Sequence, residues 1–101
     1  MQIQVITFRL ERMSPAQFDR YGQSFELAVR DTPGFVTTVC LEGQVENARG
    51  GVIVWEDAPA MAAFRHSELY ARLAMSPFVE DFQDKDMSVV PQTDFELMLA
   101  A

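Results

Sequence analysis

The sequence is poor in the residues on which disulfide and zinc chemistry depend. Its 101 residues contain one cysteine, Cys40, and one histidine, His66. A single cysteine closes no intrachain disulfide, so packing alone must hold the fold. One cysteine and one histidine also cannot assemble a zinc site from soft ligands. The sequence contains neither a glycine-rich phosphate loop nor a nucleophile elbow, and we expect neither a metal nor a cofactor.

Basic residues are also scarce. The chain has 8 Lys and Arg against 15 Asp and Glu, for a formal net charge of -7. Phosphate backbones and anionic membranes attract basic surfaces, so this charge disfavours nucleic-acid and membrane partners. The N-terminus lacks the basic start and long apolar run of a signal peptide, and no apolar run approaches bilayer length. We therefore expect a cytoplasmic protein.

Apolar residues are plentiful, and their spacing predicts the strands. Hydrophobic residues make up 49% of the chain, whose length suits one domain over 1–101. Runs rich in β-branched and aromatic residues predict strands at 3–10, 35–41, 52–55 and 86–91, and a short fifth strand at 95–100. The glycine pair before the third strand is expected to let the hairpin return tightly.

Capping residues mark the helix starts. Ser14 suits an N-cap, Pro15 suits the first helical position, and Gln17 completes a capping box for a helix ending near Arg30. Asp57 suits the N-cap of a second helix over 58–66, which Ser67 lets bend or restart through 68–74. We expect a short turn of helix at 76–83. The acidic run 80–86 lacks the ligand spacing of a calcium loop and is expected to be solvated surface.

The predicted order is β-α-β-β-α-β with an extra terminal strand. This order is typical of an α+β, ferredoxin-like fold with an antiparallel sheet and both helices on one face. The predicted elements supply no layer for the other face, and a second copy of the chain is the simplest cover. We therefore predict a homodimer whose two sheets close on each other as a barrel.

Four segments carry a family resemblance: "PGF" at 33–35, "GGVIVWED" at 50–57, "AMAAF" at 60–64 and "DMSVV" at 86–90. They resemble the small monooxygenases of the dimeric α+β-barrel superfamily, relatives of the antibiotic-biosynthesis monooxygenases. The resemblance implies a cofactor-independent oxidation of a small aromatic or polyketide-like substrate. Such a substrate, often a phenol or hydroquinone, is deprotonated in an apolar pocket and reacts directly with oxygen.

The chain departs from this pattern at polar positions. Relatives often carry a lysine and an aromatic residue on the second strand, where this chain has Thr38 and Cys40. Ile53 stands where a tyrosine often follows the glycine pair, and Phe64 stands where a histidine often follows an alanine. These losses favour an alternative function, a non-catalytic homodimeric module for small-molecule binding or regulation.

Trp55 and His66 are the candidate catalytic residues. Trp55 shares a strand face with Ile53. Either its indole N–H points into a cavity and orients a substrate, or the residue simply packs in the core between sheet and helices. Imidazole titrates near neutral pH, which makes His66 a candidate base for a phenolic proton. The alternatives for His66 are an exposed turn residue and, from the haem-degrading relatives, a lone haem ligand.

The candidate substrate-binding residues lie on the predicted helices and strands. Tyr21 and Tyr70 each combine a ring with a hydroxyl that either meets a substrate or belongs to core packing. Cys40 is either a pocket thiol or a small core residue. The full set is Tyr21, Thr38, Cys40, Ile53, Phe64 and Tyr70.

Overall fold

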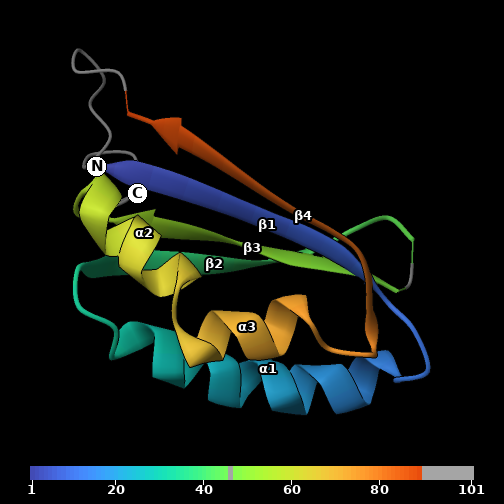
Figure 1. Cartoon of the computed structure of the whole chain (residues 1–101). Coiled ribbons are helices and arrows are strands. Elements are labelled where there is room, and N and C mark those ends of the chain that lie inside the picture. Colours follow the sequence, from blue (N-terminus) through green and yellow to red (C-terminus); the bar gives the residue numbers. More distant parts are fainter. Residues whose placement is uncertain (46, 90–101) are drawn as a thin grey trace.

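A computed structural model describes residues 1–45 and 47–89, which form a four-stranded antiparallel sheet with three helices on one face (Figure 1). The strands lie in the order β2-β3-β1-β4. Along the chain the elements are β1 (Gln2–Leu10), α1 (Pro15–Arg30), β2 (Phe35–Glu42), β3 (Ala48–Trp55), α2 (Ala58–Arg65), α3 (Glu68–Ala74) and β4 (Val79–Ser88).

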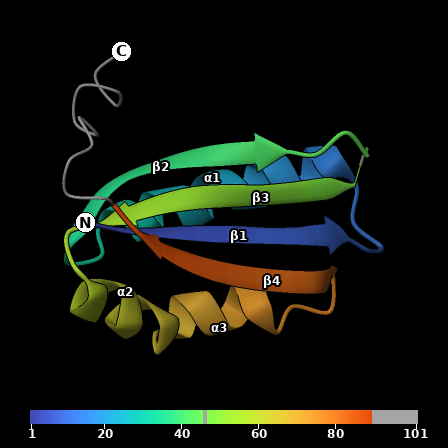
Figure 2. The same cartoon turned by 90° about the horizontal axis from the view of Figure 1, so that it is seen from above.

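The helices divide the covered face between them. Figure 2 shows α1 lying under β2 and β3, while α2 and α3 run along β4. The predicted α+β, ferredoxin-like arrangement with helices on one face is confirmed, and the second helix divides into α2 and α3 at Ser67.

The capping residues act as predicted. The Ser14 hydroxyl accepts from the Gln17 backbone N–H at 3.2 Å, and the Gln17 side chain accepts from the Ser14 backbone N–H at 3.0 Å. This reciprocal capping box satisfies N–H groups that the first turn of α1 leaves unpaired. Asp57 caps α2 by accepting from the Ala60 N–H at 2.9 Å, and Ser67 caps α3.

The segment after Pro77 corrects the predicted elements. A turn of helix is expected at 76–83, but the chain enters β4 at Val79 and remains a strand to Ser88. A register shift opposite Thr7–Arg9 and a positive φ of 52° at Asp81 interrupt the alternation that would have marked this strand. Charges are common on edge strands, because they block pairing with other chains. The predicted strand at 95–100 lies outside the described residues.

The core lies between the sheet and the helices. Alternate residues of β1 face the helices, and Gln4, Ile6, Phe8 and Leu10 are all buried. The remaining buried apolar residues of this core are Val29, Ile53, Trp55, Met61, Phe64 and Leu73. The burial of Gln4 among apolar neighbours is the one departure from the pattern on β1.

Gly50 and Gly51 have a different role from the one predicted. They lie within β3, while the hairpin turn lies nearer the start of the strand, where the Gly43 N–H donates to the Ala48 carbonyl at 3.0 Å. A Cβ on Gly50 would lie 2.3 Å from the Ile6 carbonyl oxygen, so Gly50 permits the close approach of β1. A Cβ on Gly51 would come no closer than 3.4 Å to a neighbouring atom, the Val39 carbonyl oxygen.

These two glycines generate a matched prediction. Gly50→Ala forces the β1 backbone aside and should lower the free energy of unfolding by about 2–3 kcal/mol. Gly51→Ala meets no clash and should change it by less than about 0.5 kcal/mol. Urea denaturation at one fixed protein concentration measures both. Equal losses in the two variants would contradict the close approach at Gly50.

Candidate functional site

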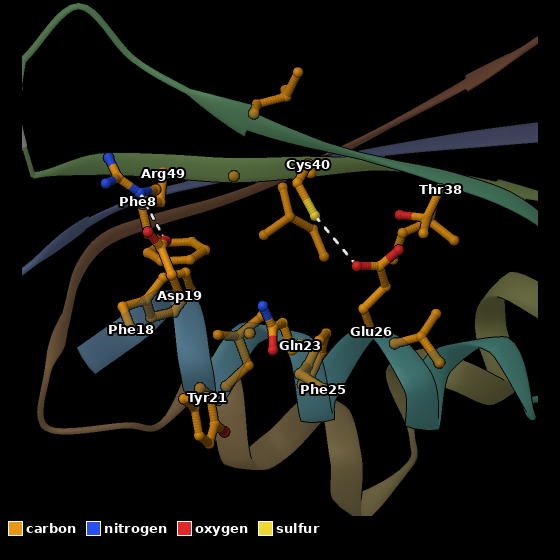
Figure 3. Close-up of a pocket in the computed structure, with 18 of the residues that line it drawn as sticks. Phe8, Phe18, Asp19, Tyr21, Gln23, Phe25, Glu26, Thr38, Cys40 and Arg49 are labelled. Atoms are coloured by element: carbon orange, nitrogen blue, oxygen red, sulfur yellow. Dashed lines mark hydrogen bonds and ion pairs between the residues drawn. The ribbon is translucent and has the colours of Figure 1, made fainter. Parts of the chain in front are cut away.

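A cavity of about 340 Å³ lies between α1 and the sheet (Figure 3). Its lining is mainly apolar on the side of the core, with Ile6, Phe8, Phe18, Phe25, Val29, Ile53 and Leu73. Its volume falls at the lower end of the range typical of small-molecule pockets, about 300–1,000 Å³. The cavity is therefore large enough for a compact aromatic ligand.

The cavity exists because small residues of the sheet lie opposite α1. In the strand register, Gly51 is the partner of both Ile6 and Cys40, so these positions form one row across the sheet. Gly51 contributes no side chain to that row. The facing side of α1 presents Phe18, Gly22, Phe25 and Val29, which recur at helical spacings of three and four. Space that a large residue at position 51 would fill stays open.

Charged groups stand at both ends of the cavity. At one end the Arg49 Nε lies 3.7 Å from a carboxylate oxygen of Asp19. At the other end the Cys40 Sγ lies 3.9 Å from the Glu26 Oε2 (Figure 3). Cys40 is an exposed residue, but partial burial raises the pKa of its thiol, and the neighbouring Glu26 carboxylate raises it further. Cys40 is therefore held as a thiol rather than as a reactive thiolate.

Several of the sequence-predicted residues lie at this cavity. Tyr21, Thr38, Cys40 and Ile53 all contribute to its lining. The Thr38 hydroxyl donates to the Val52 carbonyl at 2.9 Å, which uses its proton within the sheet. The Tyr21 ring points away from the sheet and is 41% exposed, so it lies at the outer edge (Figure 3).

The other predicted residues do not line this cavity. Trp55 and Phe64 are fully buried and pack on each other with ring centroids 5.0 Å apart. Phe64 in turn packs edge to face on the Tyr70 ring, with ring centroids 5.4 Å apart. His66 is exposed at the C-terminal cap of α2. The single histidine of the chain therefore has no contact with the cavity between α1 and the sheet.

Trp55 and Tyr70 belong instead to a polar network within the core. The Trp55 indole N–H donates to Gln4 Oε1 at 3.0 Å, and Gln4 Nε2 donates to Asp84 Oδ2 at 2.9 Å. The Tyr70 hydroxyl donates to the same Asp84 oxygen at 2.6 Å. Arg65 completes the network with two bonds to the carboxylate, at 3.0 and 2.7 Å. The buried polar groups are thus satisfied by one another.

The network determines how its members ionise. Burial alone would raise the pKa of Asp84, but hydrogen bonds from Arg65, Tyr70 and Gln4 outweigh it and hold that pKa below the ordinary value. Burial, together with the bond to Asp84, raises the pKa of Tyr70 to about 12. Tyr70 therefore stays protonated at neutral pH and acts as a donor to Asp84.

Sequence reasoning missed Gln4, Asp84 and Glu26. A signal for Gln4 was present, because a polar residue at an inward position of an apolar strand needs a buried partner. Asp84 was placed in a solvated acidic surface, and the structure corrects this: its side chain is 11% exposed. Glu26 carried no signal beyond its place on α1, since only the packing of α1 against β2 brings it to the cavity.

The chain is similar in structure to several solved proteins. A variant of SnoaB from Streptomyces nogalater, described as a cofactor-independent oxygenase, matches with a TM-score of 0.74 at 21% identity over 92% of this chain and 95% of that one. A structure described as an antibiotic biosynthesis monooxygenase matches with a TM-score of 0.72 at 16% identity, over 90% and 100% of the two chains. A variant of MhuD, whose structure carries two manganese protoporphyrin IX molecules per active site, matches with a TM-score of 0.71 at 18% identity, over 92% and 98%.

These likenesses confirm that the chain has the fold of the antibiotic biosynthesis monooxygenases, as its motifs indicated. The sequence matches no protein-family model, and no curated protein is significantly similar to it. Within residues 1–45 and 47–89, no helix is long and apolar enough to cross a membrane. In the same residues, no three His, Cys, Asp or Glu side chains gather as a metal site.

The Asp84 network generates a prediction about stability and pH. Removing one partner of a fully buried ion pair costs about 3–5 kcal/mol, and the partial exposure of Arg65 should reduce the cost of Asp84→Asn to about 2 kcal/mol. Because the folded pKa of Asp84 is lowered, its stabilisation is complete above the ordinary carboxyl pKa. It is lost as the pH falls through the lowered value. The difference in unfolding free energy between wild type and variant should be full at about pH 7 and smaller at about pH 3.

Asp86→Asn is the matched control for this prediction. Asp86 lies two positions along the same strand and meets the same Arg65 guanidinium at 3.6 Å, but its side chain is 52% exposed. An exposed pair of this kind contributes about 0–1 kcal/mol. Equal losses in Asp84→Asn and Asp86→Asn, measured by urea denaturation, would refute the special role of Asp84.

Proposed function

We propose that this protein is a cofactor-independent monooxygenase that oxidises a small aromatic or polyketide-like substrate in the cavity between α1 and the sheet. The cavity itself is the observation that carries the proposal, because its apolar lining and volume suit an aromatic body. The shared fold with SnoaB, described as a cofactor-independent oxygenase, supports the reaction class.

The reaction asks the protein to bind and shield the substrate. A substrate that loses a proton to solvent forms a stabilised carbanion that can react directly with dioxygen, and a proton is taken up again when water leaves. When a ring CH₂ is converted to a carbonyl in this way, one oxygen atom enters the product and the other leaves as water. An apolar cavity limits the access of bulk water to the reacting intermediate. Dioxygen is the only co-reactant that this balance requires.

Four lining residues are proposed to contact the substrate: Tyr21, Thr38, Cys40 and Ile53. Ile53 offers apolar surface on the wall formed by the sheet. Cys40 offers a protonated thiol at the end of the cavity where it meets Glu26. Trp55 and Tyr70 would not contact the substrate, because their polar atoms bond to Gln4 and Asp84. They would support the site only through the packing of the core. We assign His66 no contact with a substrate in this cavity.

We further propose that the protein assembles as a homodimer through the sheet face opposite the helices. Val39, Val52 and Val5 form a row across β2, β3 and β1 on that face. Ile3 and Met87 form a second row across β1 and β4. Val39 is 53% exposed and Met87 is 57% exposed. An apolar sheet face of this kind suits a second, identical face, which would give the predicted barrel of two sheets.

Oxygen consumption tests the proposed reaction. The wild-type protein, with no metal or flavin added, should consume oxygen in the presence of at least one member of a panel of hydroquinones and anthrones. Gly51→Leu projects a side chain into the cavity and should reduce this rate at least about tenfold, equivalent to roughly 1.4 kcal/mol of lost stabilisation. Gly51→Ala, which leaves most of the cavity open, is the control.

Two outcomes of that experiment would count against the proposal. Full activity in a folded Gly51→Leu protein would show that the reaction takes place somewhere other than this cavity. No oxygen uptake by the folded wild-type protein, combined with calorimetric binding of the same aromatics, would support the non-catalytic binding or regulatory module instead.

Light scattering tests the proposed dimer. The wild-type protein should be a dimer at micromolar concentration. Val39→Glu places a charge in the proposed apolar interface and should raise the dimer dissociation constant at least about tenfold. Leu27→Glu is the control, because Leu27 is 66% exposed on α1, away from that sheet face. A monomeric wild-type protein would contradict the proposed assembly.

A further inference from the structure

Glu26 occupies a distinctive place in the cavity wall. It lies where α1 faces β2, at the opposite end of the cavity from the Arg49–Asp19 pair (Figure 3). Its side chain is 31% exposed, so the carboxylate is partly shielded from water. A ligand that extends along the cavity toward Cys40 would meet this group.

The two oxygens of Glu26 have unequal partners. Oε1 accepts from the Arg30 guanidinium at 2.8 Å, an ion pair one helical turn along α1. The only donor that reaches Oε2 among the described residues is the Cys40 thiol, at 3.9 Å. A thiol is a weak donor, and this distance is at the outer limit of such a bond. Oε2 is therefore a fixed carboxylate oxygen with unused accepting capacity on the cavity side.

The aromatic lining of the cavity suits an aromatic ring. The Phe25 ring lies toward the Glu26 end of the cavity, whereas the Phe8 and Phe18 rings lie at the Arg49–Asp19 end (Figure 3). Phe8 and Phe18 contact each other edge to face, with centroids 5.4 Å apart. A flat ring in this region would place a substituent within reach of Oε2. A hydroxyl at about 2.5–2.7 Å would make a much stronger bond to a carboxylate than the thiol does.

We propose that Glu26 is the specificity-determining residue of the cavity, and that it selects aromatic ligands carrying a hydroxyl donor by accepting that hydroxyl's hydrogen bond through Oε2. This inference rests on the proposed function, in that it needs the cavity to be the ligand site. It assigns recognition of the hydroxyl, which the phenolic substrates implied by the family resemblance carry, to one residue. It also disfavours the corresponding ethers, which have no proton to donate.

Calorimetric titration with three matched naphthalenes tests the inference. The probes are α-naphthol, its methyl ether and α-naphthoate. The wild-type protein should bind the naphthol at least about tenfold more tightly than the ether, since a hydrogen bond to a charged acceptor is lost with the ether. That ratio should fall several-fold in Glu26→Gln and to about one in Glu26→Met, with little change in binding of the ether itself.

Glu68→Gln is the matched control. Glu68 forms the same type of ion pair with Arg72, four residues along α3, at 3.1 Å. It is not part of the cavity lining, so the ratio should keep its wild-type value in this variant. The labelling rate of Cys40, the only thiol in the sequence, locates the ligand, because a naphthol in the cavity should slow that labelling.

The outcomes separate this inference from the proposed function. Equal affinity of wild type for the naphthol and its ether, or an unchanged ratio in Glu26→Met, overturns the role of Glu26 and leaves the cavity as a ligand site. If naphthoate binds most tightly of the three probes, the role of Glu26 is also overturned, because the carboxylate of the ligand would then pair with Arg49 and not with Glu26. Failure of all three probes to bind, or binding without protection of Cys40, overturns both the inference and the assignment of the site.

Discussion

The carboxylate of Asp84 is the group on which the arrangement of α2 and α3 over the sheet depends. It lies on β4 and receives hydrogen bonds from Gln4 on β1, Arg65 on α2 and Tyr70 on α3. Through Gln4 the network extends to the indole of Trp55 on β3. A half-satisfied network of this kind would cost more than an apolar core, so every member must be in place at once. The network therefore couples the positions of α2 and α3 to the sheet.

The same network explains why Trp55 and Tyr70 look like site residues in the sequence. Each is an aromatic residue with a polar atom, at a position that faces the helices or the sheet. Their polar atoms are engaged in the core, and their rings pack with Phe64. The open space lies further along the sheet, where Gly51 and the small side chains of Thr38 and Cys40 face α1. The core is thus filled at the Trp55 end and open at the Gly51 end.

Much of the fold was predictable from local patterns. The first strand, the capping box at Ser14 and the N-cap at Asp57 each depend on a few neighbouring residues, and each was confirmed. The strand β4 was predicted only at its end, where the expected strand at 86–91 overlaps it over 86–88. Its alternation is broken by the register shift near Asp81, and its inward residues are Phe82 and a carboxylate, Asp84, whose partners are distant in sequence.

The residues of the candidate site also divide into those that local patterns predict and those that only the packing brings together. By itself the sequence determined the order of the elements, the capping of the helices and the strand faces on which Thr38, Cys40 and Ile53 lie, because these follow from spacing along the chain. Only the tertiary structure decided that Glu26 and Cys40 meet across a cavity, and that His66 lies away from it. The physical reason is that a cavity is defined by where side chains fail to fill space between packed elements. That failure depends on contacts between residues far apart in sequence, which no local pattern records.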